Sequence, residues 1–145
     1  PENMHVEGCR AAFYRALLRD SELACEFSIN WCSDYLWIDN GPDSGEHLEA
    51  RTWENNDYVV TIGTQDGEMI HSRAKNNDMM PVKLKSYGDQ LALVESSSAG
   101  LVLPIEKVYL NQVCQIHFAV AWAPRKPYDV STWYAVDISH RTLID

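Results

Sequence analysis

The spacing of apolar residues changes near residue 25, and this change divides the chain into two parts. Between Met4 and Ala24, apolar side chains recur at intervals of three and four residues, which is typical of one helix face. Asn3 precedes this segment in a position suited to an N-cap. From Ile29 onward, apolar and polar residues alternate with a period of two, which is typical of strands. The pattern therefore predicts an N-terminal helix followed by a β-rich region.

Turn-forming residues divide the β-rich region into short strands. Asp66-Gly67 and Gly88-Asp89 each separate two strand-like segments, so each predicts a hairpin. Pro104 places its strand near a sheet edge, because proline cannot donate to a ladder. We expect an α+β fold in which the N-terminal helix packs against a strongly curved, mainly antiparallel sheet of about six to eight strands. The expected strands are Ile29 to Ile38, Tyr58 to Thr64, Glu68 to Ala74, Val82 to Tyr87, Gln90 to Glu95, Leu101 to Ile105, Val113 to Ala123 and Thr132 to Ser139.

Length and composition fit one domain spanning residues 1–145. Apolar residues make up 46% of the chain and charged residues 23%, which is typical of a globular protein able to bury a core. No apolar run approaches the roughly 20 residues that span a bilayer, and no signal peptide is expected. Cys9, Cys25, Cys32 and Cys114 match neither a disulfide scaffold nor a zinc ribbon. We therefore expect reduced thiols, a cytoplasmic location and no membrane partner.

The negative charge is concentrated in one quarter of the chain. Between Asp34 and Glu68 there are nine acidic residues and one base, Arg51, so this segment carries nearly all of the net charge of −9. Such a field selects cationic partners, and it disfavours nucleic acid, whose phosphates require clustered bases. Three of the five tryptophans lie in or beside the same segment. We expect a surface that docks a basic protein, formed by Trp31, Trp53, Asp39, Asp43, Glu46 and Glu49.

The loop from Asp39 to Glu46 carries three carboxylates, the ligand type that calcium prefers. The standard calcium-binding loop needs Asp or Asn at its third place, Gly at its sixth and Glu at its twelfth. Here those places hold Gly41, Ser44 and Ala50. No phosphate-binding loop, dinucleotide fingerprint or nucleophile motif is found either. We therefore expect no metal and no cofactor.

Aromatic residues alternate along the segment from Ile29 to Ile38. In an extended chain Ile29, Trp31, Tyr35 and Trp37 lie on one side. Two interpretations remain open for this side: a platform on which a ligand stacks, or a core face. We favour the core face, because buried aromatic residues are commoner than stacking platforms.

The segment from Val113 to Ala123 has one side with unusually small residues. Ala119, Ala121 and Ala123 lie on the side opposite its apolar core face. An exposed strand normally carries threonine or charged residues there, whereas small residues allow another element to approach closely. We therefore predict that this side is covered by a second subunit or by the walls of a pocket. A homodimer is the expected assembly, with its interface away from the acidic segment.

His117 lies on the same side as these alanines. If this strand pairs with Thr132 to Ser139 so that Trp122 faces Thr132, then His117 faces Asp137. Such a pair can act as a base and its orienting group. The predicted ligand pocket around it comprises Gln115, His117, Trp133, Tyr35 and Trp37.

Three functions therefore remain open. The first is a module that binds a basic protein, and the second is a protein that binds a small molecule on the curved sheet. The third is an enzyme that uses the pair His117 and Asp137 in that pocket. We favour a non-enzymatic binding protein, because no motif for a reaction is present.

Overall fold

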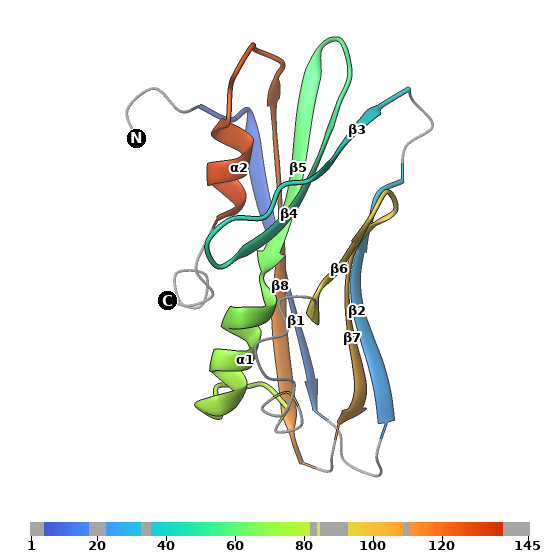
Figure 1. The fold of residues 1–145 in the computed structure, drawn as a ribbon, viewed down its shortest axis with the longest axis vertical. Coiled ribbons are helices and arrows are strands. Elements are labelled where there is room, and N and C mark those ends of the chain that lie inside the picture. Colours follow the sequence, from blue (N-terminus) through green and yellow to red (C-terminus); the bar gives the residue numbers. More distant parts are fainter. Residues whose placement is uncertain are drawn as a thin grey trace.

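The computed structural model of the chain describes residues 5–17, 23–32, 36–81, 84, 93–108 and 111–137. Within this part of the chain, eight strands form two antiparallel sheets, accompanied by two short helices (Figure 1). The prediction of a mainly antiparallel, strand-rich fold is confirmed. The expectation of one curved sheet is not, because the strands divide between two open sheets.

The larger sheet has five strands, with the long strand β8 paired on both sides. Their order across the sheet is β1 (Gly8–Leu17), β8 (Val113–Pro124), β5 (Tyr58–Gln65), β4 (Leu48–Glu54) and β3 (Ile38–Pro42). The smaller sheet consists of β2 (Leu23–Asn30), β7 (Gly100–Val108) and β6 (Glu95–Ser97).

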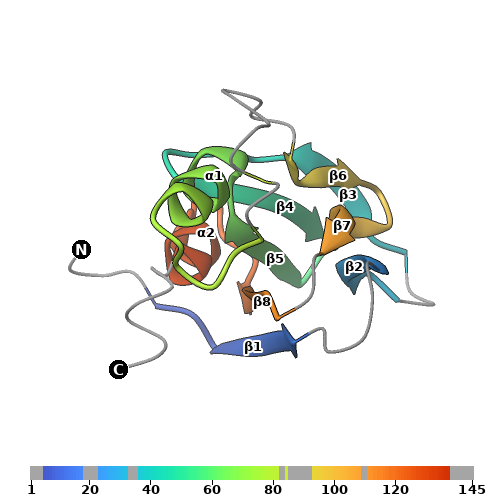
Figure 2. The same cartoon turned by 90° about the horizontal axis from the view of Figure 1, so that it is seen from below.

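The molecule has three layers (Figure 2). The helices α1 (Gly67–Lys75) and α2 (Ser131–Val136) lie on one side of the larger sheet, and the smaller sheet lies on the other. Alternate residues of β8 therefore face different layers. Those facing the smaller sheet join the main core, which includes Cys114, Ile116, Phe118, Trp53, Ile62, Leu101, Leu103 and Ile105.

The predicted N-terminal helix is wrong, because residues 8–17 form strand β1 and residues 23–30 form β2. Alanine, leucine and arginine favour helices intrinsically, and they dominate this segment. However, β1 pairs with β8 along its whole length, from Gly8 opposite Trp122 to Leu17 opposite Val113. The helix propensities of ordinary residues differ by only about a few tenths of a kcal/mol per residue. A continuous ladder of backbone hydrogen bonds outweighs such a preference.

The predicted hairpin at Asp66-Gly67 is also wrong, because a helix follows Asp66. Strand β5 ends at Gln65, and the Asp66 carboxylate accepts a hydrogen bond from the backbone N–H of Met69 at 2.8 Å. This bond caps α1 at its N-terminus. Aspartate followed by glycine suits both a hairpin turn and a helix start, so the dipeptide alone could not distinguish them.

The segment predicted as a strand from Thr132 instead contains helix α2, residues 131–136. Ser131 at its start donates both its backbone N–H and its hydroxyl to Asp129. Strand β4 was not predicted at all, and the expected strand Ile29 to Ile38 divides between the end of β2 and the start of β3. The predicted hairpin from Val82 to Glu95 falls largely outside the described residues.

The strands predicted around Tyr58, Leu101 and Val113 are confirmed as β5, β7 and β8. Strand β6 pairs only with residues 100–102, so among the described strands β7 has β2 alone as its neighbour at Pro104. This agrees with the edge position that proline requires. Neither described helix is long and apolar enough to cross a membrane.

Candidate functional site

The alanine-rich side of β8 is covered, as predicted, but the cover is a helix of the same chain. Ala119 and Ala121 are fully buried and pack with Val136 of α2. Gly63 on β5 lies opposite Ala119, and a Cβ atom on it would lie 2.8 Å from a methyl group of Val136. Small residues on both strands therefore let α2 approach the sheet closely. This face is unavailable as a dimer interface.

The predicted pair of His117 and Asp137 rested on a strand beginning at Thr132, where the structure has helix α2 instead. His117 belongs to β8, which lies between β1 and β5, and its side chain is 1% exposed. Its ring lies 5.8 Å from that of Phe13, and its carbonyl accepts a hydrogen bond from the Thr64 hydroxyl. Asp137, by contrast, is exposed at the C-terminal end of α2. Gln115 of the predicted pocket is also buried.

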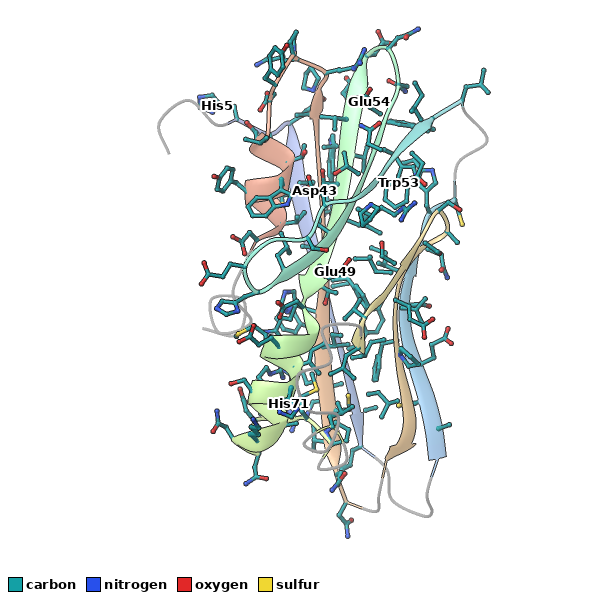
Figure 3. The ribbon with its side chains drawn as sticks, viewed as in Figure 1. His5, Asp43, Glu49, Trp53, Glu54 and His71 are labelled. Carbon is teal, nitrogen blue, oxygen red and sulfur yellow. The ribbon has the colours of Figure 1, made fainter. Side chains whose placement is uncertain are left out.

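The tryptophans of the acidic segment form a cluster that packs on the core. The rings of Trp31 and Trp53 are stacked with centroids 4.9 Å apart, and Trp37 meets Trp31 edge-on at 5.2 Å. Trp53 is buried on the side of β4 that faces the smaller sheet (Figure 3). Trp31 and Trp37 are partly buried and pack against the core, as the core-face interpretation predicts, although Trp31 was also expected on the docking surface. Trp53 is buried, so the surface role predicted for it is wrong. Tyr35 lies outside the described residues.

Two of the acidic side chains are neutralised by arginines. The guanidinium of Arg51 binds Asp39 through both carboxylate oxygens, and it also donates to the Ser96 hydroxyl at 3.3 Å. This contact holds the pKa of the Asp39 carboxyl below its ordinary value. Arg125 donates to Glu54 at 2.9 Å. Asp39 and Glu54 are thus engaged within the fold, which weakens the case for Asp39 as a predicted docking group for a basic partner.

Of the acidic segment, Glu46 lines a cavity on the helical side of the larger sheet, together with Asp137 at the end of α2. Its volume is about 430 Å³, and one side is open to solvent. The cavity lies between the turn before β4, the start of α1 and helix α2. It is lined by Glu46, His47, Gln65, Met69, Trp133, Tyr134 and Asp137. Trp133 was predicted for the pocket, Glu46 for the acidic surface and Asp137 for the catalytic pair; the others were not predicted.

The turn before β4, which forms one wall of the cavity, is hydrogen-bonded to α2. The indole N–H of Trp133 donates to the carbonyl of Asp43 at 2.9 Å, at the junction marked by Asp43 in Figure 3. Gly45 lies against the same ring, and a Cβ atom there would lie only 2.3 Å from it. The backbone N–H of Gly45 donates to the Leu48 carbonyl, which closes the turn. Trp133 therefore sets the position of the wall that carries Glu46 and His47.

Beside the cavity, three side chains direct ligand-type atoms toward one another. One such atom from each of His47, Asp66 and Glu68 lies within 4.8 Å of the other two. The Nε2 atom of His47 is also 3.9 Å from the Glu46 carboxylate. Imidazole and carboxylate groups bind divalent cations, and carboxylates also bind organic cations. No sequence motif indicated this group, because its members come from separate segments that the β4–β5 hairpin brings together.

The electrostatic environment next to this group is negative. Glu49 on β4 is half-buried, and this burial raises the pKa of its carboxyl; the charge of Asp66 acts in the same direction. The Ser44 hydroxyl donates to Glu49 at 2.9 Å and partly opposes the shift. Among the described residues, no lysine or arginine lines the cavity. The site therefore attracts positive charge.

The charge of its walls distinguishes this cavity from two others of similar volume. One of about 390 Å³ lies between β3 and residues 125–130, and its walls include Arg125 and Lys126 as well as acids. The other, of about 330 Å³, contains Arg15 and no acidic residue. Only the first of the three combines carboxylates with two aromatic side chains and no lysine or arginine.

No protein-family model, no curated protein and no solved structure matches this chain. The function is therefore argued from the geometry of the cavity.

Proposed function

We propose that the protein is a non-enzymatic binding protein whose ligand is an organic cation, an ammonium or guanidinium group, held in the cavity between α1, α2 and the turn before β4. The observation that carries this proposal is the composition of the walls. Trp133 and Tyr134 supply aromatic rings, Glu46 and Asp137 supply carboxylates, and no described lysine or arginine lines the cavity.

The two rings suit a cation because they offer π-faces in two orientations. Their centroids are 5.0 Å apart and their planes are nearly perpendicular, at 83°. A cation over such a ring gains about 0.5–2 kcal/mol, more as it is desolvated. The carboxylates add charge-assisted hydrogen bonds, and Met69 provides a polarisable apolar contact. The volume falls in the range of small-ligand sites and accepts one lysine or arginine side chain or one small free amine.

The same walls argue against a reaction at this site. Of the expected catalytic pair, Asp137 lines the cavity, whereas His117 on β8 is buried and is not among its lining residues. His47, Asp66 and Glu68 can attract and orient a cation, but they present no nucleophile paired with a base. Binding without chemistry is thus the better-supported function, and a basic side chain of a partner protein is a natural source of the cation.

Isothermal titration calorimetry tests the proposal with defined probes. N-acetyl-arginine methylamide and N-acetyl-lysine methylamide serve as free cations, a peptide rich in arginine represents a protein source, and N-acetyl-glutamine methylamide is the neutral control. We expect the single cations to bind with a Kd on the order of 1 mM, equivalent to about 4 kcal/mol. Affinity should fall as salt is added, because exposed charges are screened. Tighter binding of the peptide than of the amides would identify a protein as the source.

Charge-neutralising variants locate the binding. Glu46→Gln and Asp137→Asn should each weaken cation binding by about fivefold, the equivalent of roughly 1 kcal/mol for a partly exposed pair. Asp57→Asn is the matched control, because Asp57 is exposed in the turn between β4 and β5 and does not line the cavity. Equal losses in all three variants would show only a general field effect and would contradict a site in this cavity.

Zinc chloride is titrated separately, because His47, Asp66 and Glu68 carry metal-ligand atoms. Saturable binding of zinc without any binding of the organic cations would replace the proposal with a metal site. Competition between the two would place both at the same carboxylates and would support the cavity as a cation site.

A further inference from the structure

Strand β1 is an edge strand that is exposed on both faces. It pairs with β8 over its full length, and no other described strand pairs with its second edge. Every side chain from Cys9 to Arg15 is exposed, including Phe13 at 40% and Tyr14 at 45%, and Leu17 follows at 46%. In Figure 2 β1 lies at the lower edge of the larger sheet, next to β8. A long, regular strand with apolar residues therefore faces solvent.

The opposite edge of the same sheet is protected in the usual ways. Strand β3 has only five residues, contains Pro42, and shows a register shift against β4 between Asp39 and Gly41. Short length, proline and bulges all hinder the addition of another strand. By contrast, β1 has ten residues without proline, and its pairing with β8 contains no shift. One edge of the sheet is closed to pairing, and the other is open to it.

Charge indicates which partner suits this edge. The chain has a net charge of −9, yet β1 contains two arginines, Arg10 and Arg15, and no acid. Two copies that approach through β1 therefore meet at a strand that carries no acid, away from the acidic segment. An interface at the acidic segment would bring like charges together.

We propose that β1 pairs antiparallel with β1 of a second copy, so that the two larger sheets join across a twofold axis. A twofold axis perpendicular to the sheet places residues of the same face opposite one another. The register with Phe13 opposite the partner's Phe13 overlaps residues 9–17 of both strands. Arg10 then faces the partner's Ala16, and Arg15 faces the partner's Ala11. The register pairs two aromatic rings and sets no like charges opposite each other, which favours cross-strand pairing.

The measurement is the molar mass by light scattering across a wide range of protein concentrations. The wild type should approach twice the mass of one chain as concentration rises. Phe13→Lys should remain monomeric, because it sets two lysines face to face at the axis and lysine is a common edge guard. Ile38→Lys is the matched control, because Ile38 is 62% exposed on β3, the opposite edge, and this variant should dimerise like the wild type. Phe13 is 40% exposed and its ring also contacts that of His117, so circular dichroism checks that each variant keeps the fold.

Cysteine cross-linking tests the register independently. In a background with Cys9 and Cys32 replaced by serine, Phe13→Cys should form a disulfide-linked dimer on mild oxidation. Ala12→Cys, one residue away and on the other face, should form far less. A wild type that stays monomeric at every concentration overturns the proposal, and so does a Phe13→Lys variant that still dimerises. A cross-link at residue 12 alone would overturn the register. Cation binding by Phe13→Lys should be unchanged, so the two proposals fail separately.

Discussion

At the scale of single residues, the ion pair between Arg51 and Asp39 shows that part of the acidic segment stabilises the fold. Arg51 is buried beside the Trp53 ring, and its guanidinium donates hydrogen bonds to Asp39 and Ser96. The sequence showed Arg51 as the single base of the segment, but it did not indicate that the side chain is buried. Burial of a charge is a property of the assembled sheets, so local pattern could not reveal it.

Asp39→Asn should lower the free energy of unfolding by about 1.5–3 kcal/mol at neutral pH, the usual worth of a hydrogen bond to a charged group. The pKa of Asp39 is lowered in the folded state, so its stabilisation is present above the unfolded pKa and is lost as pH falls through the folded pKa. The difference between variant and wild type should therefore shrink in acid. Urea unfolding at neutral and acidic pH measures it. Asp43→Asn, an exposed acid of the same segment, is the control, and an equal effect there would contradict the account.

The cysteines should differ in reactivity according to burial. Burial raises the pKa of the Cys114 thiol to about 12, whereas Cys32 is exposed. Cys9 is exposed, but its thiol donates to the carbonyl of Ala135 and its pKa is raised by partial burial. Because the thiolate is the reactive form, iodoacetamide should label Cys32 first and Cys114 only on unfolding. Mass spectrometry of the native protein follows the order, and equal labelling of Cys114 and Cys32 would contradict the buried position of β8.

At the scale of elements, strands with a clear period of two could be predicted, and segments with mixed signals could not. The alternation along β8 gave both its core face and its covered face. The segment that forms β1 has helix-forming residues, and its strand conformation depends on β8, which lies far away in the chain. Two other segments were also ambiguous. The helix after Asp66-Gly67 depends on a cap, and the helix after Val130 depends on packing against small residues of the sheet. The cavity lies between these mispredicted elements, so most of its walls could not be predicted.

The sheet surface packed against helix α2 should not accommodate a larger side chain. Ala121→Leu adds methylene groups where Ala121, Leu48 and Val136 are already in contact, and overpacking of this kind costs about 1–3 kcal/mol. Ala99→Leu makes the same change at an exposed alanine of the turn between β6 and β7, and should be nearly neutral. Urea unfolding compares the two. Similar midpoints for both variants would mean that α2 does not pack closely on the sheet.

At the scale of the whole molecule, charge and strand exposure are separated in space. The helical side of the larger sheet holds a cavity with carboxylates and aromatic rings, and β1 at the sheet edge holds Arg10, Arg15 and exposed apolar residues. An assembly through β1 would leave the cavity of each copy on the helical side of the joined sheet. Composition indicated an acidic protein with a cationic partner, but only the fold distinguishes the acids engaged by arginines from those around the cavity.

The central claim is that this cavity holds a cation, and the indole N–H resonance of Trp133 reports on it directly. That group donates to the turn carrying Glu46, so an occupant between the rings must disturb it. On titration with N-acetyl-arginine methylamide, the account predicts a saturable shift of this resonance that is strongly reduced in the combined variant Glu46→Gln and Asp137→Asn. A Trp133 resonance that does not move while the other indole resonances shift would place the cation elsewhere and contradict the account.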